Sequence, residues 1–302
     1  MAISWALEVI QLGMSDAIVN VNGQILPPDQ ATVSVFDRGY LYGDSLYEVT
    51  RSYDGKFFKL KDHLSRLKKS AELCQMALNQ DLTLYEKEIY RTFEAFRTSS
   101  KTEAYCRIII SRGAGKIGFG LNCLKTPTLY TIIVQPVDAP TPESFEKGFR
   151  LKISARLRND RRALDPAMKS GNYLNSLLAY LEATRENFDD ALLCNEEGHV
   201  AEGTTFNVFY ARRGILATPP LDIGILDGIT RKLVIDLASQ IGIETREIRF
   251  PRERLYEADE IFLSSSVREV FPITAIDGKK INNGEPGPIT RKLHEAYQQL
   301  LG

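Results

Sequence analysis

The chain has 302 residues and a mass of 34.0 kDa, which is more than one hydrophobic core usually serves, so we expect two domains. Hydrophobic residues make up 43% of the chain and charged residues 25%, which excludes a disordered or fibrous protein. Lys and Arg number 38 against 39 Asp and Glu, and the net charge of -1 offers no broad basic surface for nucleic acid or an anionic membrane.

Cysteine usage and hydropathy favour a cytoplasmic protein. Cys74, Cys106, Cys123 and Cys194 are far apart in the chain, without a CxxC pair or a Cys/His cluster at metal-ligand spacing. We therefore expect reduced, buried thiols and no metal site. No run of about 18 apolar residues occurs, and residues 1–14 lack the basic segment of an export signal. The sequence thus predicts neither export nor a membrane span.

The first part of the chain alternates predicted hairpins with amphipathic helices. Asn22-Gly23 and Asp54-Gly55 favour the positive φ angles of tight hairpin turns. Apolar residues recur every three or four positions over 62–78, which predicts a helix with one buried stripe. Thr83 and Glu86 have the spacing of a capping box and predict the start of a second helix.

Three prolines within residues 135–144 interrupt both helix and strand patterns and indicate a linker. We therefore predict a first domain over 1–134 and a second domain over 145–302. The second domain alternates strands with helices and is predicted to be mixed α/β. Its predicted elements are strands at Phe149–Ala155, Ala191–Asn195, Thr205–Tyr210 and Ile261–Leu263 and helices from about Tyr173, over Ile229–Ile241 and over Pro288–Leu300.

Lysine is the first candidate for chemistry, because the chain has only three histidines and no GxSxG, HExxH, Walker A or GxGxxG motif in its required context. Lys169 lies among small neutral residues, with no carboxylate nearby in the sequence. Desolvation in such surroundings lowers the pKa of an amine and exposes the lone pair that forms an imine. On these neighbours alone, a solvated surface lysine is the alternative interpretation.

Three segments can hold an anionic group. Asp227-Gly-Ile-Thr230 opens a predicted helix, where the amides of Ile229 and Thr230 favour a phosphate. Ser264-Ser-Ser266 follows a predicted strand at its carboxyl end. Arg66 is a potential bidentate donor on a helix. Ordinary helix capping, a polar loop and a solvated arginine are the respective alternatives.

Glu202 is a candidate partner for a ring nitrogen, because it lies in an otherwise uncharged stretch next to a predicted strand. A carboxylate in that place can keep a cofactor cationic, so that it draws electrons. A solvated turn residue is the alternative. An activated lysine, an isolated carboxylate and three phosphate donors together match what pyridoxal 5'-phosphate requires.

The order and context of these residues resemble the fold-type IV aminotransferases, from about residue 17 to the C-terminus. This family contains branched-chain amino acid aminotransferases, D-amino acid aminotransferases, (R)-selective amine transaminases and aminodeoxychorismate lyases. The resemblance rests on Asp37-Arg-Gly-Tyr-Leu-Tyr-Gly-Asp44, Lys169 before Gly171-Asn-Tyr-Leu-Asn-Ser176, Glu202-Gly203, Gly228-Ile-Thr-Arg231 and Ser264-Ser-Ser266 before Glu269. It implies an α/β fold with a smaller N-terminal two-layer α/β sandwich and a larger C-terminal α/β pseudo-barrel.

The resemblance also implies roles for individual residues. Lys169 would be the Schiff-base lysine and later the proton carrier, Glu202 the partner of the pyridine nitrogen and Tyr173 a neighbour of the phenolic oxygen. The residues implied to hold the phosphate are Arg66, Ile229, Thr230, Ser265 and Ser266. A homodimer is implied as well, with active sites at the domain junction completed by a loop of the partner subunit, for which we consider Asp37–Tyr42.

The substrate class is divided between two groups of the family. A strand is predicted over Ala104–Ser111, where a period of two residues puts Tyr105 and Arg107 on one face. This pair resembles the branched-chain group, whose L-specific members seat the substrate carboxylate near the position of Arg107. The triplet Tyr47-Glu-Val49 resembles the D-amino acid group, but Lys116-Ile-Gly118 replaces that group's arginine and histidine loop.

We therefore expect an aminotransferase that uses branched-chain L-amino acids and 2-oxoglutarate. The residues expected to bind substrate are Tyr42, Tyr47, Val49, Arg51, Tyr105 and Arg107. D-amino acid or (R)-amine transamination is the alternative, and an aminodeoxychorismate lyase ranks third. The segment Ser111-Arg-Gly-Ala-Gly115 resembles the lyase group, but that group uses a threonine near Val49. A module that binds a phosphorylated ligand is the non-enzyme alternative.

Overall fold

The structure, a computed structural model, describes residues 16–100 and 102–301 and divides into two compact units. Unit 1 ends at Asp138 and also includes Met168–Asn172, whereas unit 2 contains Ala139–Ala167 and the residues from Tyr173 onward. The chain thus leaves unit 1 inside the predicted linker, and the segment that carries Lys169 returns to unit 1. The domain bounds 1–134 and 145–302 stay a prediction, and the expectation for residues 1–14 lies outside the described residues.

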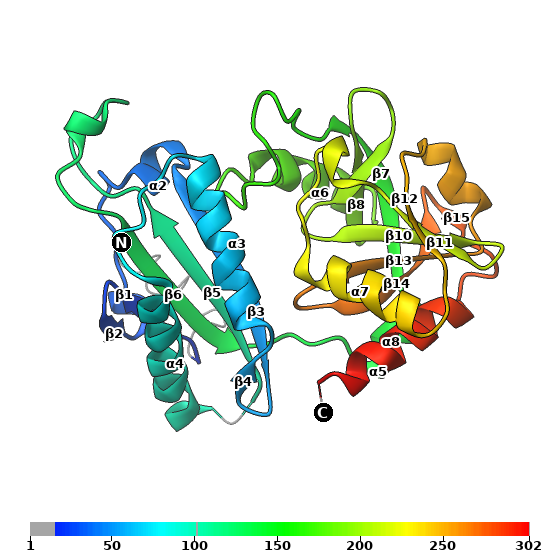
Figure 1. Cartoon of the computed structure of the whole chain (residues 1–302), viewed down its shortest axis with the longest axis horizontal. Helices are drawn as coiled ribbons and strands as arrows, with labels where there is room; N and C mark the ends of the chain where they lie inside the picture. The colour runs from blue at the N-terminus through cyan, green and yellow to red at the C-terminus, as the bar shows by residue number, and fades with distance from the viewer. Residues whose placement is uncertain (1–15, 101, 302) are drawn as a thin grey trace, which may run out of the picture. The chain divides into compact units, whose positions relative to one another are not determined.

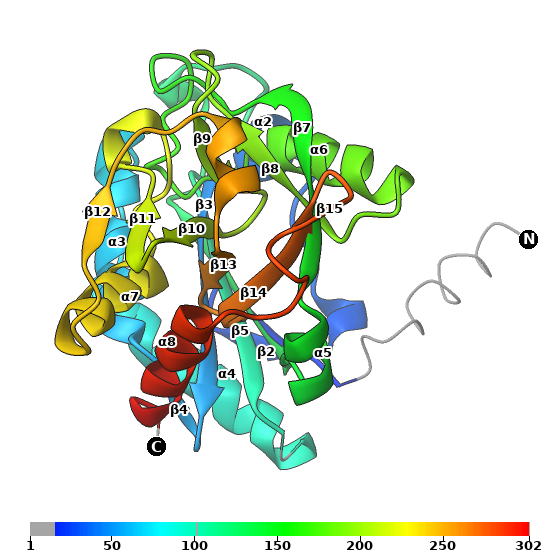
Figure 2. The same cartoon turned by 90° about the vertical axis from the view of Figure 1, so that its right-hand side faces the viewer.

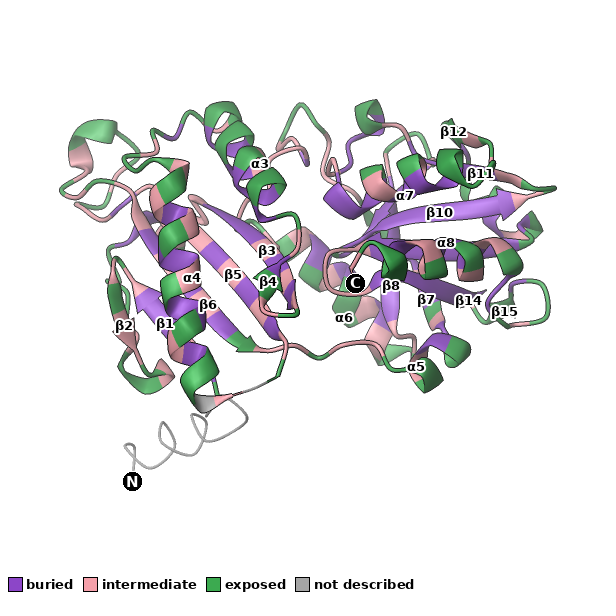
Figure 3. Cartoon of the chain, turned by 60° about the horizontal axis from the view of Figure 1, so that its bottom comes forward, coloured by how far each residue is buried: buried purple, intermediate pink, exposed green. Residues whose placement is uncertain are grey.

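Unit 1 is one antiparallel sheet with two long helices on one face, which confirms the predicted two-layer sandwich (Figure 1). Its elements are β1 Ile18–Val21, β2 Gln24–Leu26, η1 Pro28–Gln30, α2 Arg38–Tyr42, β3 Ser45–Tyr53, β4 Lys56–Phe57, α3 Leu60–Leu73, α4 Leu82–Ser99, β5 Ala104–Ser111, η2 Leu121–Cys123 and β6 Leu129–Pro136. The strand order is β2-β1-β6-β5-β3-β4. Buried and partly exposed residues alternate along the central strands, because one sheet face packs on α3 and α4 (Figure 3).

Both predicted hairpin turns form. Asn22 and Gly23 have φ angles of 50° and 92°, and Asp54 and Gly55 have 47° and 76°. Positive φ at both central residues is the geometry that matches the twist of two-residue hairpins, and asparagine, aspartate and glycine adopt it most readily. These turns fix the pairing of β1 with β2 and of β3 with β4.

The first long helix ends earlier than its apolar pattern predicts. The pattern extends over 62–78, but α3 stops at Leu73. Gln75 has a φ of 52°, and the Met76 amide donates to the Ala71 carbonyl at 2.8 Å. A left-handed residue after the last turn, with such a backward hydrogen bond, ends a helix whatever the apolar pattern beyond it.

Two helix starts also differ from prediction. Asp81 caps α4 by accepting a hydrogen bond from the Thr83 amide at 3.4 Å, so the predicted capping box at Thr83 is wrong. Within the predicted linker, helix α5 begins at Pro142, with Thr141 forming a capping box. Proline is tolerated in the first helical position because the amide it lacks has no partner in the helix there.

Unit 2 is built on one mixed sheet of order β12-β11-β10-β13-β14-β7-β8-β9, with β15 added to β14. Its elements are α5 Pro142–Lys147, β7 Phe149–Leu157, α6 Leu174–Arg185, β8 Asp190–Cys194, β9 Val200–Gly203, β10 Asn207–Arg212, β11 Ile215–Thr218, η3 Leu221–Ile223, α7 Ile229–Gln240, β12 Thr245–Glu247, η4 Arg252–Glu257, β13 Glu260–Ser265, β14 Glu269–Ile276, β15 Lys279–Lys280 and α8 Pro288–Gln299. Helices α7 and α8 pack against β13 and β14, and α6 packs against β7 and β8 (Figures 1 and 2).

The sheet of unit 2 curls toward closure. Strand β9 ends the sheet order, yet the chain passes from it directly into β10 near the other end, and the Gly203 amide donates to the Phe206 carbonyl at 2.8 Å. The main apolar core of the unit draws on strands from both ends of the sheet. This arrangement confirms the expected pseudo-barrel. No helix in the described part of the chain is long and apolar enough to cross a membrane.

Candidate active site

Lys169 lies in an extended segment that completes the outer edge of the sheet of unit 1. The Tyr47 amide donates to the Lys169 carbonyl at 3.0 Å, and the Gly171 amide donates to the Ser45 carbonyl at 2.8 Å. The Lys169 amide donates in turn to the Ser70 hydroxyl on α3 at 3.2 Å. The backbone on both sides of the lysine side chain is therefore held by β3 and α3.

The Lys169 amine points over an aromatic ring. Its Nζ atom is 4.5 Å from the centroid of the Tyr47 ring, and the guanidinium carbon of Arg107 is 4.3 Å from the same centroid. Cations at such distances are attracted by the electron-rich face of a ring. One tyrosine thus contacts both the candidate nucleophile and a candidate carboxylate-binding group.

Five of the six predicted substrate residues come together on one face of the sheet. Arg51 lies opposite Tyr105, and Val49 lies opposite Arg107, in the β3–β5 pairing. Alternation puts these side chains, with Tyr47, on the face that does not pack on α3 and α4. Burial raises the pKa of Tyr105, although Arg107 works against the shift, so the phenol keeps its proton at neutral pH.

Tyr42 is the exception, and its contacts go elsewhere. It lies in α2, where its hydroxyl accepts a hydrogen bond from the Gly118 amide at 3.0 Å. Its ring packs on that of Phe119, with 5.2 Å between the two ring centroids. The surrounding segment Asp37–Tyr42, expected to be a loop, is a short helix. Asp37 caps it by accepting from the Gly39 amide at 2.7 Å.

A buried group of polar side chains occupies the helix-facing side of β3; we call Glu48, His63 and Arg66 the Glu48 cluster. Arg66 donates from Nε to one Glu48 oxygen at 2.7 Å and from Nη2 to the other at 2.8 Å. His63 Nδ1 lies 2.7 Å from that second oxygen. Burial alone would raise the pKa of Glu48, but Arg66 and His63 bring it down to about 2. Burial lowers the pKa of His63, so the neutral ring donates to an ionised Glu48.

The sequence identified Arg66 but not its partner. Glu48 appeared only as the middle residue of the triplet Tyr47-Glu-Val49, and a solvated arginine was the alternative interpretation of Arg66. In the structure the Arg66 side chain is only 11% exposed, because the carboxylate of Glu48 draws it toward the sheet. No local pattern signals a pair separated by 18 residues.

In unit 2, Glu202 is a buried carboxylate held on all sides. It lies within β9 rather than beside a strand. Its Oε1 accepts from Nε and Nη2 of Arg158 at 2.9 and 2.8 Å. Its Oε2 accepts from the Leu226 amide at 3.1 Å and from the Asn207 side chain at 3.3 Å. Such pairing is what a buried negative charge requires, and it fixes the direction of the carboxylate.

The N-terminal turn of α7 is buried and lacks a side-chain cap from the described residues. Ile229 and Thr230 lie in this turn, after Gly228 at the cap position. A β-carbon on Gly228 would be 2.0 Å from the side-chain oxygen of Asn207, so only glycine fits. Buried first-turn amides need an acceptor, and an anion is the natural one.

The three predicted serines differ in their surroundings. Ser264, which pairs with Asn207 across β13 and β10, is buried, and its hydroxyl has no hydrogen-bond partner in the described part of the chain. Ser265 accepts a hydrogen bond from the Arg268 amide at 3.0 Å. Ser266 follows β13 in the turn toward β14. The sequence could not single out Ser264, because nothing local distinguishes the three hydroxyls.

Tyr173 occupies the N-cap position of α6, as the predicted helix start requires. Each unit contains groups of the kinds that pyridoxal phosphate requires: unit 1 has a primary amine and a guanidinium, and unit 2 has an anchored carboxylate, uncapped helix amides and an orphaned buried hydroxyl. Among the described residues, no group of three or more His, Cys, Asp or Glu side chains is arranged to bind a metal ion.

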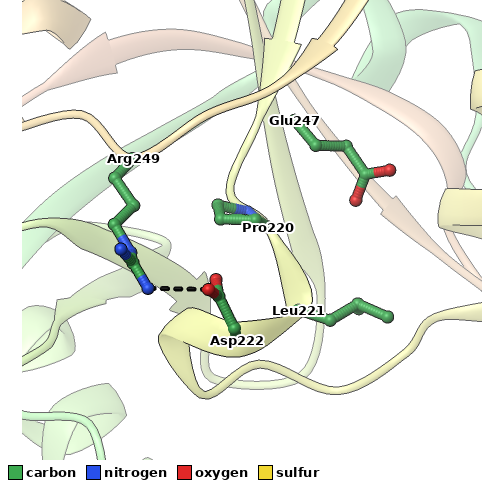
Figure 4. A pocket seen from close by; sticks show the side chains of 5 residues that line it. All are labelled: Pro220, Leu221, Asp222, Glu247 and Arg249. Atoms are coloured by element: carbon green, nitrogen blue, oxygen red, sulfur yellow. Dashed lines mark hydrogen bonds and ion pairs between the residues drawn. The ribbon is translucent and has the colours of Figure 1, made fainter.

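A surface pocket in unit 2 is distinct from these residues. It is lined by Pro220, Leu221, Asp222, Glu247 and Arg249 (Figure 4). Arg249 donates to Asp222 at 2.7 Å across it, so these two charged groups already pair with each other. None of the predicted catalytic or cofactor-binding residues lines this pocket.

Comparison with known proteins identifies the family of the chain. The family described as "Amino-transferase class IV" matches residues 45–276. A Methanocaldococcus jannaschii protein with the provisional name branched-chain-amino-acid aminotransferase is 39% identical, with 93% of this chain and 96% of that protein covered. The D-alanine aminotransferase of Bacillus licheniformis is 33% identical, with 93% and 95% covered.

A solved structure gives the same result for the fold. The branched-chain amino acid aminotransferase from Thermobaculum terrenum, in its pyridoxal-phosphate form, has a TM-score of 0.81 and 32% identity to this chain. The alignment covers 94% of this chain and 93% of that one. The matched fold, the family match over residues 45–276 and the identity of its relatives lead to one conclusion: this chain belongs to the class IV aminotransferases.

Proposed function

We propose that this chain is a pyridoxal-phosphate-dependent aminotransferase that transfers the amino group of L-leucine, L-isoleucine or L-valine to 2-oxoglutarate. One observation carries the proposal: the Lys169 amine and the Arg107 guanidinium contact the same ring, that of Tyr47, at 4.5 and 4.3 Å. An amine that can react and a group that can bind carboxylates therefore lie next to the same tyrosine ring. Membership of an aminotransferase family makes the chain an enzyme, so the binding-module alternative is dropped.

Class IV aminotransferases use pyridoxal phosphate, and the Thermobaculum terrenum structure holds this cofactor. When bound, the cofactor supplies an electrophilic carbon and a ring that accepts electrons. In this chain we assign the covalent attachment to Lys169, the contact with the ring nitrogen to Glu202 and the contact with the phenolic oxygen to Tyr173. The residues proposed to hold the phosphate are Arg66, Ile229, Thr230, Ser265 and Ser266.

The chain's own groups account for the proton movements. In the proposed reaction, the Lys169 amine, which lies over the Tyr47 ring, is the group that accepts a proton from the substrate Cα. Glu202, paired with Arg158, stabilises a proton on the ring nitrogen by its negative charge. The backbone of Lys169 and the carboxylate of Glu202 are each held by several hydrogen bonds.

The sheet face around Arg107 suits two kinds of substrate. The side chains of Tyr47, Val49 and Tyr105 offer hydrocarbon surface for a branched side chain. Arg51 and Arg107 are diagonal neighbours across β3 and β5, so a dicarboxylate such as 2-oxoglutarate can meet two cations. A single face can therefore accept both partners of the reaction in turn.

A second candidate is D-amino acid transamination. Val49 lies directly opposite Arg107, and the triplet that contains it is of the D-amino acid type. The D-alanine aminotransferase of Bacillus licheniformis is also about as similar to this chain as some of the branched-chain enzymes are. The pair Tyr105 and Arg107 decides our preference for L-amino acids. Activity on (R)-amines and lyase activity rank below both.

We further propose a homodimer. Two segments of unit 1, residues 33–40 and 117–121, carry exposed large apolar side chains. Arg38 in the first segment donates to the Gly118 carbonyl in the second at 2.8 Å. The exposed apolar side chains of both segments, which we call the 33–121 patch, are Val33, Val35, Phe36, Tyr40, Ile117, Phe119 and Leu121. Phe119 is 81% exposed. Exposed apolar side chains grouped on two such segments are typical of a surface that another protein covers, and a second copy is the occupant that the family resemblance suggests.

The first prediction concerns Lys169. Reduction of the cofactor-loaded protein with borohydride should remove its yellow absorbance and leave a pyridoxyl label on Lys169, found by mass spectrometry of its peptides. Lys169→Ala should take up no label, whereas Lys152→Ala, which removes a lysine paired with Glu186, should label as the wild type does. A label on another lysine would reject the assignment.

The second prediction concerns Glu202. Glu202→Gln should lower kcat by about 100-fold or more while cofactor still binds, because a neutral amide cannot stabilise a protonated ring nitrogen. Steady-state kinetics and the absorbance of bound cofactor measure the two effects separately. Glu186→Gln is the matched control on an exposed glutamate. Activity of Glu202→Gln within a few-fold of wild type would show that the ring nitrogen has another partner.

The third prediction concerns substrate handedness. L-leucine, L-isoleucine and L-valine should be preferred, and Arg107→Ala should lower kcat/KM for them by roughly 10- to 150-fold, the effect of a charge-assisted hydrogen bond of about 1.5 to 3 kcal/mol. Arg97→Ala on α4 serves as the control. If D-alanine or D-glutamate reacts faster than L-leucine in the wild-type protein, the L-specific assignment is wrong and Val49 is the better guide.

The fourth prediction concerns assembly. Sedimentation should give a species of about twice 34.0 kDa, and Ile117→Asp with Phe119→Asp should shift it toward monomer by placing charges in the 33–121 patch. Leu73→Asp, at an exposed leucine outside the patch, should leave the dimer intact. A fully active wild-type protein that sediments only at 34.0 kDa would rule the dimer out.

A further inference from the structure

We propose that Glu48 is a positioning residue that aims the guanidinium of Arg66 at the cofactor phosphate. The inference rests on the proposed function, in which Arg66 is one of the phosphate ligands. It assigns a role to a carboxylate that the proposed reaction does not otherwise use. All residues in the argument belong to unit 1.

The geometry of the pair is that of a clamp. Both Glu48 oxygens are engaged by Arg66, through Nε at 2.7 Å and Nη2 at 2.8 Å. Two parallel bonds between a carboxylate and a guanidinium fix the plane of the guanidinium as well as its position. An arginine on a long flexible stem thereby loses most of its freedom before any ligand arrives, which lowers the entropy cost of binding.

His63 restrains the carboxylate of Glu48 from rotating. Its Nδ1 lies 2.7 Å from the Glu48 oxygen that also accepts from Nη2 of Arg66. The packing that encloses Glu48 also buries His63, and burial lowers the pKa of the imidazole, as do Arg66 and Lys169, while Glu48 raises it. The neutral ring adds no charge to the site, so its contribution is to hold the carboxylate in place.

The placement of Glu48 in β3 links it to the reactive lysine. Its neighbour Tyr47 faces the other side of the sheet and donates its amide proton to the Lys169 carbonyl. One peptide of β3 thus anchors Lys169, while the next side chain anchors Arg66. A rigid strand therefore sets the separation between the covalent attachment point and the guanidinium, which a cofactor with a fixed distance between aldehyde and phosphate demands.

Charge alone makes the opposite prediction, and this permits a sharp test. A carboxylate beside a phosphate site repels a dianion, so its removal should tighten phosphate binding if Glu48 acts only through its charge. If Glu48 acts by positioning Arg66, its removal should weaken phosphate binding. The two effects have opposite signs, and only one of them can dominate the measured affinity.

The experiment compares two probes of the cofactor-free protein, pyridoxal 5'-phosphate and pyridoxal, which lacks the phosphate. Dissociation constants come from absorbance titrations, and their ratio isolates the contribution of the phosphate. We expect Glu48→Gln to weaken pyridoxal phosphate by about tenfold and pyridoxal by much less, the loss expected for a disturbed charge-assisted bond. Glu48→Asp keeps the charge but shortens the side chain, and it should shift the ratio in the same direction.

Arg66→Ala separates this inference from the proposed function. If Arg66→Ala leaves the ratio unchanged, Arg66 does not bind the phosphate and the proposed role fails regardless of Glu48. If Arg66→Ala changes the ratio but Glu48→Gln and Glu48→Asp leave it unchanged or tighten phosphate binding, the positioning role is wrong. In the Arg66→Ala background, Glu48→Gln should alter the ratio by less than about twofold, and a larger effect would show that Glu48 acts through another group.

A matched control addresses folding. Glu88, which is buried, pairs with Arg91 at 2.7 Å on α4, in the same unit but away from Lys169. Glu88→Gln should lower the melting temperature without moving the ratio of the two dissociation constants. If Glu48→Gln fails to fold, Glu48→Asp provides the same comparison, because it retains the negative charge that Arg66 and His63 require.

Discussion

The pairing of residues 169–171 with the edge of β3 is the interaction on which the candidate site depends. The first half of β3 has β5 on one side only, and its other edge would expose unpaired amides and carbonyls. The extended segment around Lys169 satisfies that edge through Tyr47 and Ser45. Because a backbone ladder is stiffer than a loop, the sheet itself places the backbone of the candidate lysine, although residues 168–172 are separated in sequence from the rest of unit 1.

Both units solve the problem of buried charge in the same way. Glu48 pairs with Arg66, and Glu202 pairs with Arg158, each at 2.9 Å or less. Removing one member of a buried pair leaves an uncompensated charge, so each carboxylate and its arginine depend on each other. These hydrogen bonds also matter for function, because a carboxylate or guanidinium that is held by two or more of them has a fixed orientation.

Alternating burial gave the most accurate strand bounds from the sequence. Strand β5 has the predicted bounds Ala104–Ser111, because one face packs on helices and every second residue is buried along most of the strand. Continuously buried strands lack this period of two: β10 and β13 were predicted only with shifted bounds, and β14 Glu269–Ile276, which contains Pro272, was not predicted. Helix α3 ends earlier than predicted because Gln75 adopts a left-handed backbone conformation. Glutamine is not a residue type that indicates this conformation in a sequence.

The same limit applies to the site. Lys169 and Glu202 became candidates because uncharged neighbours isolate them in the sequence, and the family resemblance implied their roles. Their partners were not recognisable, since Arg158 is 44 residues from Glu202 and only the fold brings them together. The sequence could not distinguish Ser264 from the two serines that follow it. The register between β13 and β10, which pairs Ser264 with Asn207, is visible only in the structure. Charged pairs distant in sequence are visible only in three dimensions, and here they orient the groups proposed to react.

Transfer of nitrogen between two substrates is the central claim, and isotope labelling tests it most directly. Purified protein loaded with pyridoxal phosphate should convert L-leucine labelled with nitrogen-15 and unlabelled 2-oxoglutarate into nitrogen-15 glutamate, with 4-methyl-2-oxopentanoate formed in equal amount. Mass spectrometry follows both products. Glutamate without the label, or no glutamate while D-alanine donates its nitrogen readily, would contradict the account.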